Sequence, residues 1–215
     1  MTAAAPAIVR DLAPATLEYH GTFTAAERTM AITSTLTVAQ HPAGGWAVAE
    51  HAVLPRGSAV DSARLEANTL VPRERTIRQG PLSIALAFAD GKATGTATSA
   101  NETHSIEVAL CGSLVADGAG AFLVIGRLPL ADGYRIALRH LDVQKAEQTS
   151  KYLVVLGSER TLVSAGSYDT WKVQVSEKGN TNATIIWVDK ASLVPVKFSS
   201  VQGPVTVTME LDARR

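Results

Sequence analysis

The chain has 215 residues, of which 46% are apolar and 19% charged, and its 20 basic residues balance its 20 acidic ones. This balance excludes a broad electrostatic attraction for nucleic acid, and no apolar run reaches the ~20 residues of a membrane helix. Cys111 is the single cysteine, so an internal disulfide and a CxxC site are excluded, and a chain of this length can bury a core without either.

The first residues differ in character from the rest. Residues 1–15 are expected to form a flexible leader before a single β domain at 16–215, because residues 2–7 are small and resemble the segment left after a signal is removed. A charged n-region and a long apolar h-region are missing from the start. Two locations therefore stay open: the periplasm or envelope with the signal removed, or the cytoplasm.

Strands are predicted to dominate, because β-branched Thr and Val are abundant and pack well on a pleated surface. Residues 29–40 alternate between apolar side chains and threonines, which is the period of a half-buried strand. Turn residues at 41–45 and a returning strand at 46–54 complete a hairpin. Alternation over 17–23 adds a third strand upstream, so the chain is expected to open with a meander.

After a polar connection, alternation over 82–88 leads into Asp90-Gly91, a favoured pair for a two-residue type I′ hairpin turn. Residues 92–98 are expected to pair back. Between residues 115 and 128 the apolar spacing becomes helical, which predicts one short helix. The remaining predicted strands cover residues 105–110, 134–139, 152–156, 170–175, 184–188, 194–200 and 205–211.

One internal repeat links the two halves of the chain. Leu-Val-Pro at 70–72 is followed after six residues by Gln-Gly-Pro at 79–81, and the same pattern recurs at 193–195 and 202–204. Each copy follows a polar turn with a hydroxyl and precedes an alternating strand. The alternative is chance similarity between two β-segments of one composition. The repeat predicts an all-β fold with one short helix: a strongly curved antiparallel sheet or half-open barrel of two similar halves, about 16–112 and 128–213.

The second half carries a family resemblance. The stretches 161–173, 187–190 and 193–197 resemble the closing segments of an uncharacterised bacterial envelope domain family, and the likeness touches roughly residues 60–210. Those domains look related in fold to the lipoprotein carriers LolA and LolB, whose curved antiparallel sheet half-closes around acyl chains. The shared motifs are strand and turn signatures without catalytic residues, so the resemblance implies a fold and leaves the activity open.

Motifs for chemistry are missing from the sequence. The five histidines are too far apart for a local metal signature, so no metal is expected; glycines at 118 and 120 carry no phosphate-loop or dinucleotide fingerprint, so no cofactor is expected either. The Gly-Ser pairs at 112–113 and 157–158 sit in no GxSxG elbow. His20 and His51 could meet on neighbouring strands with Glu18 or Glu50 as an acid/base or metal pair, although ordinary exposed histidines are the simpler interpretation.

Large rings are the candidates for lining a ligand cavity, because a curved sheet rich in Ala and Gly is hard to fill. Filling of the core is the alternative role for each ring. The predicted ligand-binding residues are Tyr19, Trp46, His51, Phe88, Tyr134, Trp171 and Trp187.

The sequence therefore favours a non-enzymatic binding or carrier domain for a lipid-like or other apolar small molecule in the bacterial cell envelope. One alternative is an enzyme acting on a hydrophobic molecule in the same cavity, with an acid or base such as His51, Glu50, Tyr19 or Asp61. A purely structural envelope domain with a filled interior is the other. The ligand and the oligomeric state stay open.

Overall fold

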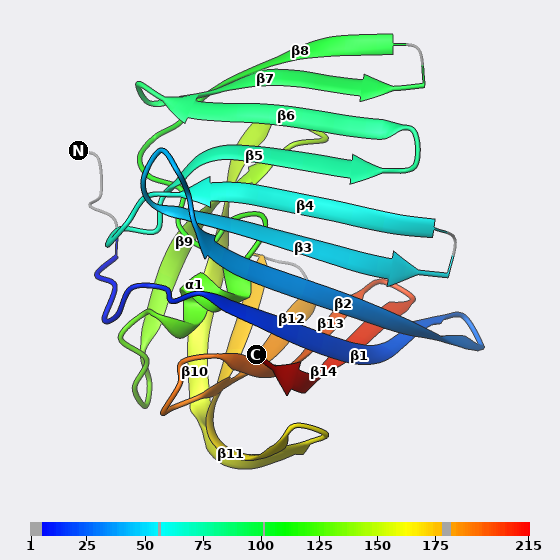
Figure 1. The fold of residues 1–215 in the computed structure, drawn as a ribbon, viewed down its shortest axis with the longest axis vertical. Coiled ribbons are helices and arrows are strands. Elements are labelled where there is room, and N and C mark those ends of the chain that lie inside the picture. Colours follow the sequence, from blue (N-terminus) through cyan, green and yellow to red (C-terminus); the bar gives the residue numbers. More distant parts are fainter. Residues whose placement is uncertain (1–5, 56, 101, 178–181) are drawn as a thin grey trace.

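The described part of the chain forms one antiparallel sheet of 14 strands with one short helix (Figure 1). The computed structural model describes residues 6–55, 57–100, 102–177 and 182–215. The predicted fold class, an all-β, strongly curved sheet with one short helix, is confirmed. The strands are β1 (Ala15–Ala25), β2 (Arg28–Gln40), β3 (Trp46–Leu54), β4 (Gly57–Leu65), β5 (Pro72–Gln79), β6 (Leu82–Ala89), β7 (Lys92–Ser99), β8 (Glu102–Ala109), β9 (Arg135–Asp142), β10 (Glu147–Val163), β11 (Gly166–Glu177), β12 (Ala183–Asp189), β13 (Pro195–Gln202) and β14 (Val205–Arg214).

Strand neighbours in the sheet are also neighbours in the chain, with one exception. The order runs from β8 back to β1, then from β14 back to β9. The exception is the pair β1 and β14, which joins the two halves from Leu17 opposite Arg214 to Ala25 opposite Val205. The ladder ends at β8 on one side and β9 on the other, so the sheet is not closed by strand pairing.

The segment between β8 and β9 fills part of the concave side of the sheet. It contains α1 (Ala121–Gly126), the one helix among the described residues, which contacts β12 and β13. Leu114 packs in one cluster with Val108 of β8 and Leu141 of β9, so this segment bridges the two unpaired edges. Its buried apolar side chains are Leu114, Val115, Leu123, Val124, Ile125 and Leu128.

Predicted elements differ from the observed ones where the pattern was polar or irregular. β4 occupies the predicted polar connection, because its concave face carries Asp61 and its alternation is therefore hidden. β10 extends over 17 residues, far beyond the predicted 152–156, and a register shift at Gly157 interrupts its period. The type I′ turn is confirmed: Asp90 and Gly91 have φ of 50° and 70°, and the Asp-Gly pair favours these positive angles.

Residues before β1 contact the body of the protein. The predicted leader begins with residues 1–5, which lie outside the described residues. Farther along, Leu12 is buried in the core and Ile8 packs against it. The Asp11 carboxylate accepts a hydrogen bond from Trp46 Nε1 at 2.7 Å.

The internal repeat has the same turn geometry in both copies. Leu70 and Leu193 have φ of 54° and 61°, in the left-handed region that leucine rarely adopts. In the first copy the Leu70 amide donates to the Glu66 carbonyl at 2.9 Å; in the second the Leu193 amide donates to the Asp189 carbonyl at 2.8 Å. A register shift follows each proline, which begins β5 or β13. The repeat is therefore structural, as its spacing predicted.

A hydroxyl and a carboxylate secure each of these turns. Thr69 Oγ1 donates to Glu66 Oε2 at 2.7 Å on the exposed surface. Ser192 Oγ donates to Asp189 Oδ2 at 2.6 Å, the Ser192 amide donates to the same oxygen at 2.8 Å, and Asp189 is buried. The second turn thus stabilises a buried carboxylate and the first does not.

We therefore expect Ser192→Ala to lower the free energy of unfolding by about 2 kcal/mol, since it removes a hydrogen bond to a buried charge. Thr69→Ala should cost less than about 1 kcal/mol, because Glu66 is solvated. Urea unfolding of both variants measures the difference. Equal losses of the free energy of unfolding in the two variants would show that the burial of Asp189 adds nothing to the stability of the second turn.

Candidate functional site

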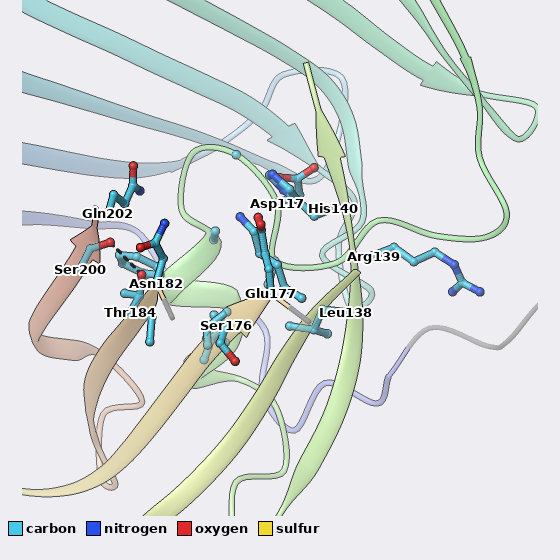
Figure 2. A pocket seen from close by; sticks show the side chains of 18 of the residues that line it. Asp117, Leu138, Arg139, His140, Ser176, Glu177, Asn182, Thr184, Ser200 and Gln202 are labelled. Atoms are coloured by element: carbon cyan, nitrogen blue, oxygen red, sulfur yellow. Dashed lines mark hydrogen bonds and ion pairs between the residues drawn. The ribbon is translucent and has the colours of Figure 1, made fainter. Parts of the chain in front are cut away.

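A cavity of about 530 Å³ lies on the concave side of the sheet. Figure 2 shows the residues that line it on β9, at the ends of β11, β12 and β13, and in the segment before α1; Asp117, His140 and Glu177 point toward one another, whereas Arg139 extends away. The innermost of these residues is buried Asp117, whereas Glu177 and Gln202 at the rim are exposed. The floor of the cavity is thus buried and charged, and its rim is exposed to solvent.

Asp117 is the centre of the charged floor. Its side chain is 5% exposed, and its oxygens accept from His140 Nδ1 at 2.8 Å and from the Leu141 amide at 3.0 Å. Arg75 Nη1 lies 3.9 Å from Oδ1. Burial opposes ionisation of Asp117, but the hydrogen bond and the charges of His140 and Arg75 outweigh burial and lower its pKa. Asp117 is therefore an anion at neutral pH, with His140 and Leu141 of β9 on one side and Arg75 on the other.

Arg75 crosses from β5 toward this carboxylate and is held by a second one. Its Nε and Nη2 donate to the two oxygens of Asp61 at 3.1 and 2.8 Å, the paired geometry in which Arg binds carboxylates best. Burial opposes the charged form, yet Asp61 and Asp117 keep the pKa of Arg75 above its ordinary value. Gly118 permits this position, because a Cβ there would lie 2.5 Å from Arg75 Nε.

Lys151 is the third cationic side chain of the floor and differs from Arg75 in having no close partner. It lies on β10 opposite Leu138 of β9 and Glu177 of β11. Among the described residues its ammonium makes no hydrogen bond and no ion pair within 4 Å. Burial lowers the pKa of Lys151; Asp117 and Glu177 favour the charged form at longer range and Arg75 opposes it.

The rest of the cavity wall is divided between hydroxyl and apolar side chains. Thr184 and Ser200 share a hydrogen bond of 2.9 Å between their hydroxyl oxygens on neighbouring strands. Facing the charged floor are side chains that need no polar partner: Phe122, Ile125, Leu138 and Val175. A molecule with one polar and one apolar part would meet matching surfaces in this cavity.

A second, smaller hollow of about 100 Å³ adjoins the first, since Gly118, Ala121 and Phe122 line both. Tyr19, Phe198 and Phe122 form its aromatic side, with ring centroids 6.1 Å apart for Tyr19 and Phe198 and 4.9 Å for Phe122 and Phe198. Glu50 is its one carboxyl group. Burial raises the pKa of Glu50, although Ser34 donates to Oε1 at 2.8 Å and favours the ionised form.

The seven predicted ligand-binding residues do not come together, and none of them lines the 530 Å³ cavity. Tyr19 lines the 100 Å³ hollow and donates to the Pro195 carbonyl at 2.8 Å. Phe88 lines a separate hollow of about 220 Å³. Trp46 is buried in the core against Asp11, and His51 is exposed. A role in binding for all seven stays a prediction.

Three more of the predicted rings have other neighbours. Tyr134 packs against the apolar cluster of the second half. Lys190 Nζ lies 4.2 Å from the Trp171 ring centre. Trp187 donates to Glu159 and has Lys172 and Lys197 at 5.4 and 5.5 Å from its ring centre. The rings of Trp171 and Trp187 are therefore each in contact with lysine ammonium groups.

The histidine pairing considered from the sequence is wrong. His20 lies on β1 and His51 on β3, and β2 separates them. His20 Nδ1 is 3.5 Å from Asp212 instead. Glu50, the neighbour of His51 in the chain, points to the opposite face because side chains alternate along a strand. The acidic candidates Glu50 and Asp61 are the ones that reach the concave side.

Sequence reasoning missed the residues of the charged floor. Asp117, His140 and Lys151 lie in three separate segments, and nothing in their local spacing marks them. A partial signal existed in β9, because His140 interrupts the apolar alternation of Ile136 and Leu138. Only the pairing of β9 with β10, and the path of the loop before α1, bring them to one cavity.

Comparison with known proteins places the chain among domains whose role is not established. A family model described as a protein of unknown function, DUF3108, matches residues 15–212. The chain belongs to the DUF3108 family. No curated protein matches it. Among the described residues no helix is both long and apolar enough to cross a membrane.

One solved structure supports the fold. A β-barrel-like DUF1849 protein from Brucella abortus is similar with a TM-score of 0.61 at 9% identity, covering 95% of this chain and 98% of that one. An inferred exported protein with a YmcC-like fold from Bacteroides fragilis aligns at a TM-score of 0.38 and 8% identity, over 98% and 99% of the two chains. The first likeness shows a barrel-like architecture for this DUF3108 chain and does not extend to activity.

Glu50 should make stability depend on pH. Its native pKa is raised above the ordinary 4.5, so between these two values the native protein holds a proton that the unfolded chain has lost. The contribution of Glu50 to the free energy of unfolding is fully present below the ordinary pKa. It is lost as pH rises through the native pKa. Glu50→Gln removes this loss and should melt higher than wild type at pH 8, with little difference at pH 4.

Melting temperatures between pH 4 and pH 8 measure this effect. Glu27→Gln, in the exposed turn between β1 and β2, is the matched control and should follow the wild-type profile. A Glu50→Gln profile parallel to wild type would contradict a protonated Glu50.

Asp117 should show the opposite dependence. Because its native pKa is lowered from 3.8, its stabilisation is present above pH 3.8 and is lost as pH falls through the native pKa. Asp117→Asn leaves Arg75 and His140 without this anion, so we expect a loss of about 3 kcal/mol at pH 7. The deficit relative to wild type should shrink toward pH 3. Asp132→Asn, in an exposed turn, should be neutral throughout, and an Asp117→Asn deficit independent of pH would refute the ionised carboxylate.

Proposed function

We propose that this DUF3108 chain is a non-enzymatic binding or carrier domain that holds a small amphipathic molecule inside its curved sheet. The observation that carries the proposal is the 530 Å³ cavity with a charged floor on one side and an apolar wall on the other. Its volume falls in the range of about 300–1,000 Å³ that suits small ligands. The proposal modifies the sequence-based expectation of a wholly apolar ligand, because the floor contains charges.

The position of the cavity supports a carrier. It opens toward the rim formed by Glu177 and Gln202, so a ligand could enter without separating paired strands. The apolar side chains that face the floor would gain about 25 cal/mol for each Å² of apolar surface removed from water by the ligand. The segment before β9 occupies the rest of the concave side, which limits the ligand to a small molecule or one short chain.

We place this binding activity in the bacterial cell envelope. The support is the resemblance of residues 161–173, 187–190 and 193–197 to an envelope domain family whose fold looks related to LolA and LolB. In those carriers a curved sheet surrounds acyl chains, and the sheet of this chain is likewise curved and unclosed.

A second candidate function is an enzyme that uses the same cavity. The observation that favours it is the buried pair of Asp117 and His140, in which a carboxylate orients an imidazole beside open space. Such a pair can transfer a proton to or from a bound molecule. The carrier is preferred because the described floor presents no Ser, Cys or Thr nucleophile bonded to His140.

Native mass spectrometry tests the carrier. We expect the gently purified protein to retain a small molecule and to lose it on denaturation. Val175→Trp, which places a ring in the cavity wall, should abolish the adduct; Ala109→Trp, on the exposed face of edge strand β8, should keep it. A ligand-free wild type that also fails to bind added C8 amphiphiles would reject the proposal. Turnover of the retained molecule would favour the enzyme.

A further inference from the structure

Asp117 on the cavity floor and Asp61 beside it already have partners. Asp61 binds both Nε and Nη2 of Arg75. Asp117 accepts from His140 and from the Leu141 amide, with Arg75 at 3.9 Å. The second hollow contributes Glu50, whose carboxyl is buried and bonded to Ser34. Each acidic group of the interior therefore has a donor or cation in contact.

Lys151 is a half-buried cation of the cavity that makes no hydrogen bond and no ion pair among the described residues. Other described lysines near acidic groups form close pairs: Lys197 with Glu210 at 2.7 Å and Lys145 with Asp142 at 3.3 Å. Glu177 faces Lys151 across the β10–β11 ladder, but it is exposed at the rim and forms no ion pair within 4 Å. A desolvated ammonium without a counter-ion is costly, and an anion supplied by a ligand would relieve that cost.

The surroundings of Lys151 suit an acid joined to an apolar group. Leu138, its direct partner on β9, is buried and lines the same cavity, as do Phe122 and Ile125. The hydroxyls of Thr184 and Ser200 lie on the wall nearer the rim and can donate to oxygen atoms. An anion at Lys151 would thus have donors around it and an apolar surface beside it.

We propose that Lys151 is the anchor for the acidic headgroup, a carboxylate or phosphate monoester, of an amphipathic ligand whose apolar part lies against Phe122, Ile125 and Leu138. This assignment rests on the proposed binding function and names the ligand class within it. Burial lowers the pKa of Lys151, as expected for a partly desolvated ammonium that lacks a close counter-ion. Asp117 and His140 then act as the rigid support beside the anchor.

Isothermal titration calorimetry at pH 7 with octanoate, octyl phosphate, octan-1-ol, octylamine and acetate tests the assignment. We expect octanoate or octyl phosphate to bind at least tenfold more tightly than octan-1-ol, octylamine not to exceed octan-1-ol, and acetate not to bind. The acetate arm separates an amphipathic acid from a free anion, and octyl phosphate against octanoate tells which headgroup is preferred.

Variants locate the preference. Lys151→Met should reduce the affinity for the acid to that for octan-1-ol and leave octan-1-ol binding unchanged; Lys151→Arg should retain the preference. Lys145→Met, which removes an exposed lysine paired with Asp142, is the matched control and should behave as wild type. Melting temperatures of all variants verify folding.

The outcomes separate the two proposals. If none of the C8 compounds binds, the proposed function itself fails. If octan-1-ol binds as tightly as the acids, or if Lys151→Met keeps the preference, the carrier stands and Lys151 is not the anchor. Tight binding of acetate alone would show a simple anion site and overturn the amphipathic assignment.

Discussion

The buried carboxylate of Asp117 is the interaction on which the interior of this protein depends. The sheet is not closed by strand pairing, so its two ends, β8 and β9, must be held by contacts across the concave side. Asp117 lies in the segment that crosses this space, accepts hydrogen bonds from His140 and Leu141 of β9, and attracts Arg75 of β5. A charge in this position connects the two halves of the sheet only while it stays ionised.

The same arrangement produces the cavity. Apolar side chains of the crossing segment fill the concave side where Leu114 meets Phe88 and Leu141. Around Asp117 and Arg75 the side chains are instead fixed by hydrogen bonds and ion pairs, and the cavity lies beside them. A hollow with one charged and one apolar side is the result. The binding function and the anchor at Lys151 both use this division, because each part of an amphipathic ligand would meet its own kind of surface.

The curved antiparallel sheet expected from the sequence agrees with the structure, but the interior differs from the expected one. The sequence led us to expect aromatic rings around an oily hollow. Trp46 instead packs in the core, Trp171 and Trp187 lie beneath lysine ammonium groups, and the cavity floor is built from Asp117, His140, Arg75 and Lys151. A ring is recognisable in a sequence by its type, but the face of the sheet it occupies follows from strand register. A register shift, such as those at Gly157 and Trp187, moves the following side chains to the other face.

The amino-acid sequence by itself determined the strands, their turns and the repeated corner, because these depend on neighbours in the chain. Alternation over 29–40 and 82–88, Asp90-Gly91, and the two Leu-Val-Pro corners were all readable, and the corners share their hydrogen bonds in the structure. Only the tertiary structure decided which polar side chains meet. Asp61, Arg75, Asp117, His140 and Lys151 come from β4, β5, a loop, β9 and β10, and their convergence depends on the curvature of the whole sheet. No local pattern encodes such a meeting, since its physical cause is long-range pairing and not residue spacing.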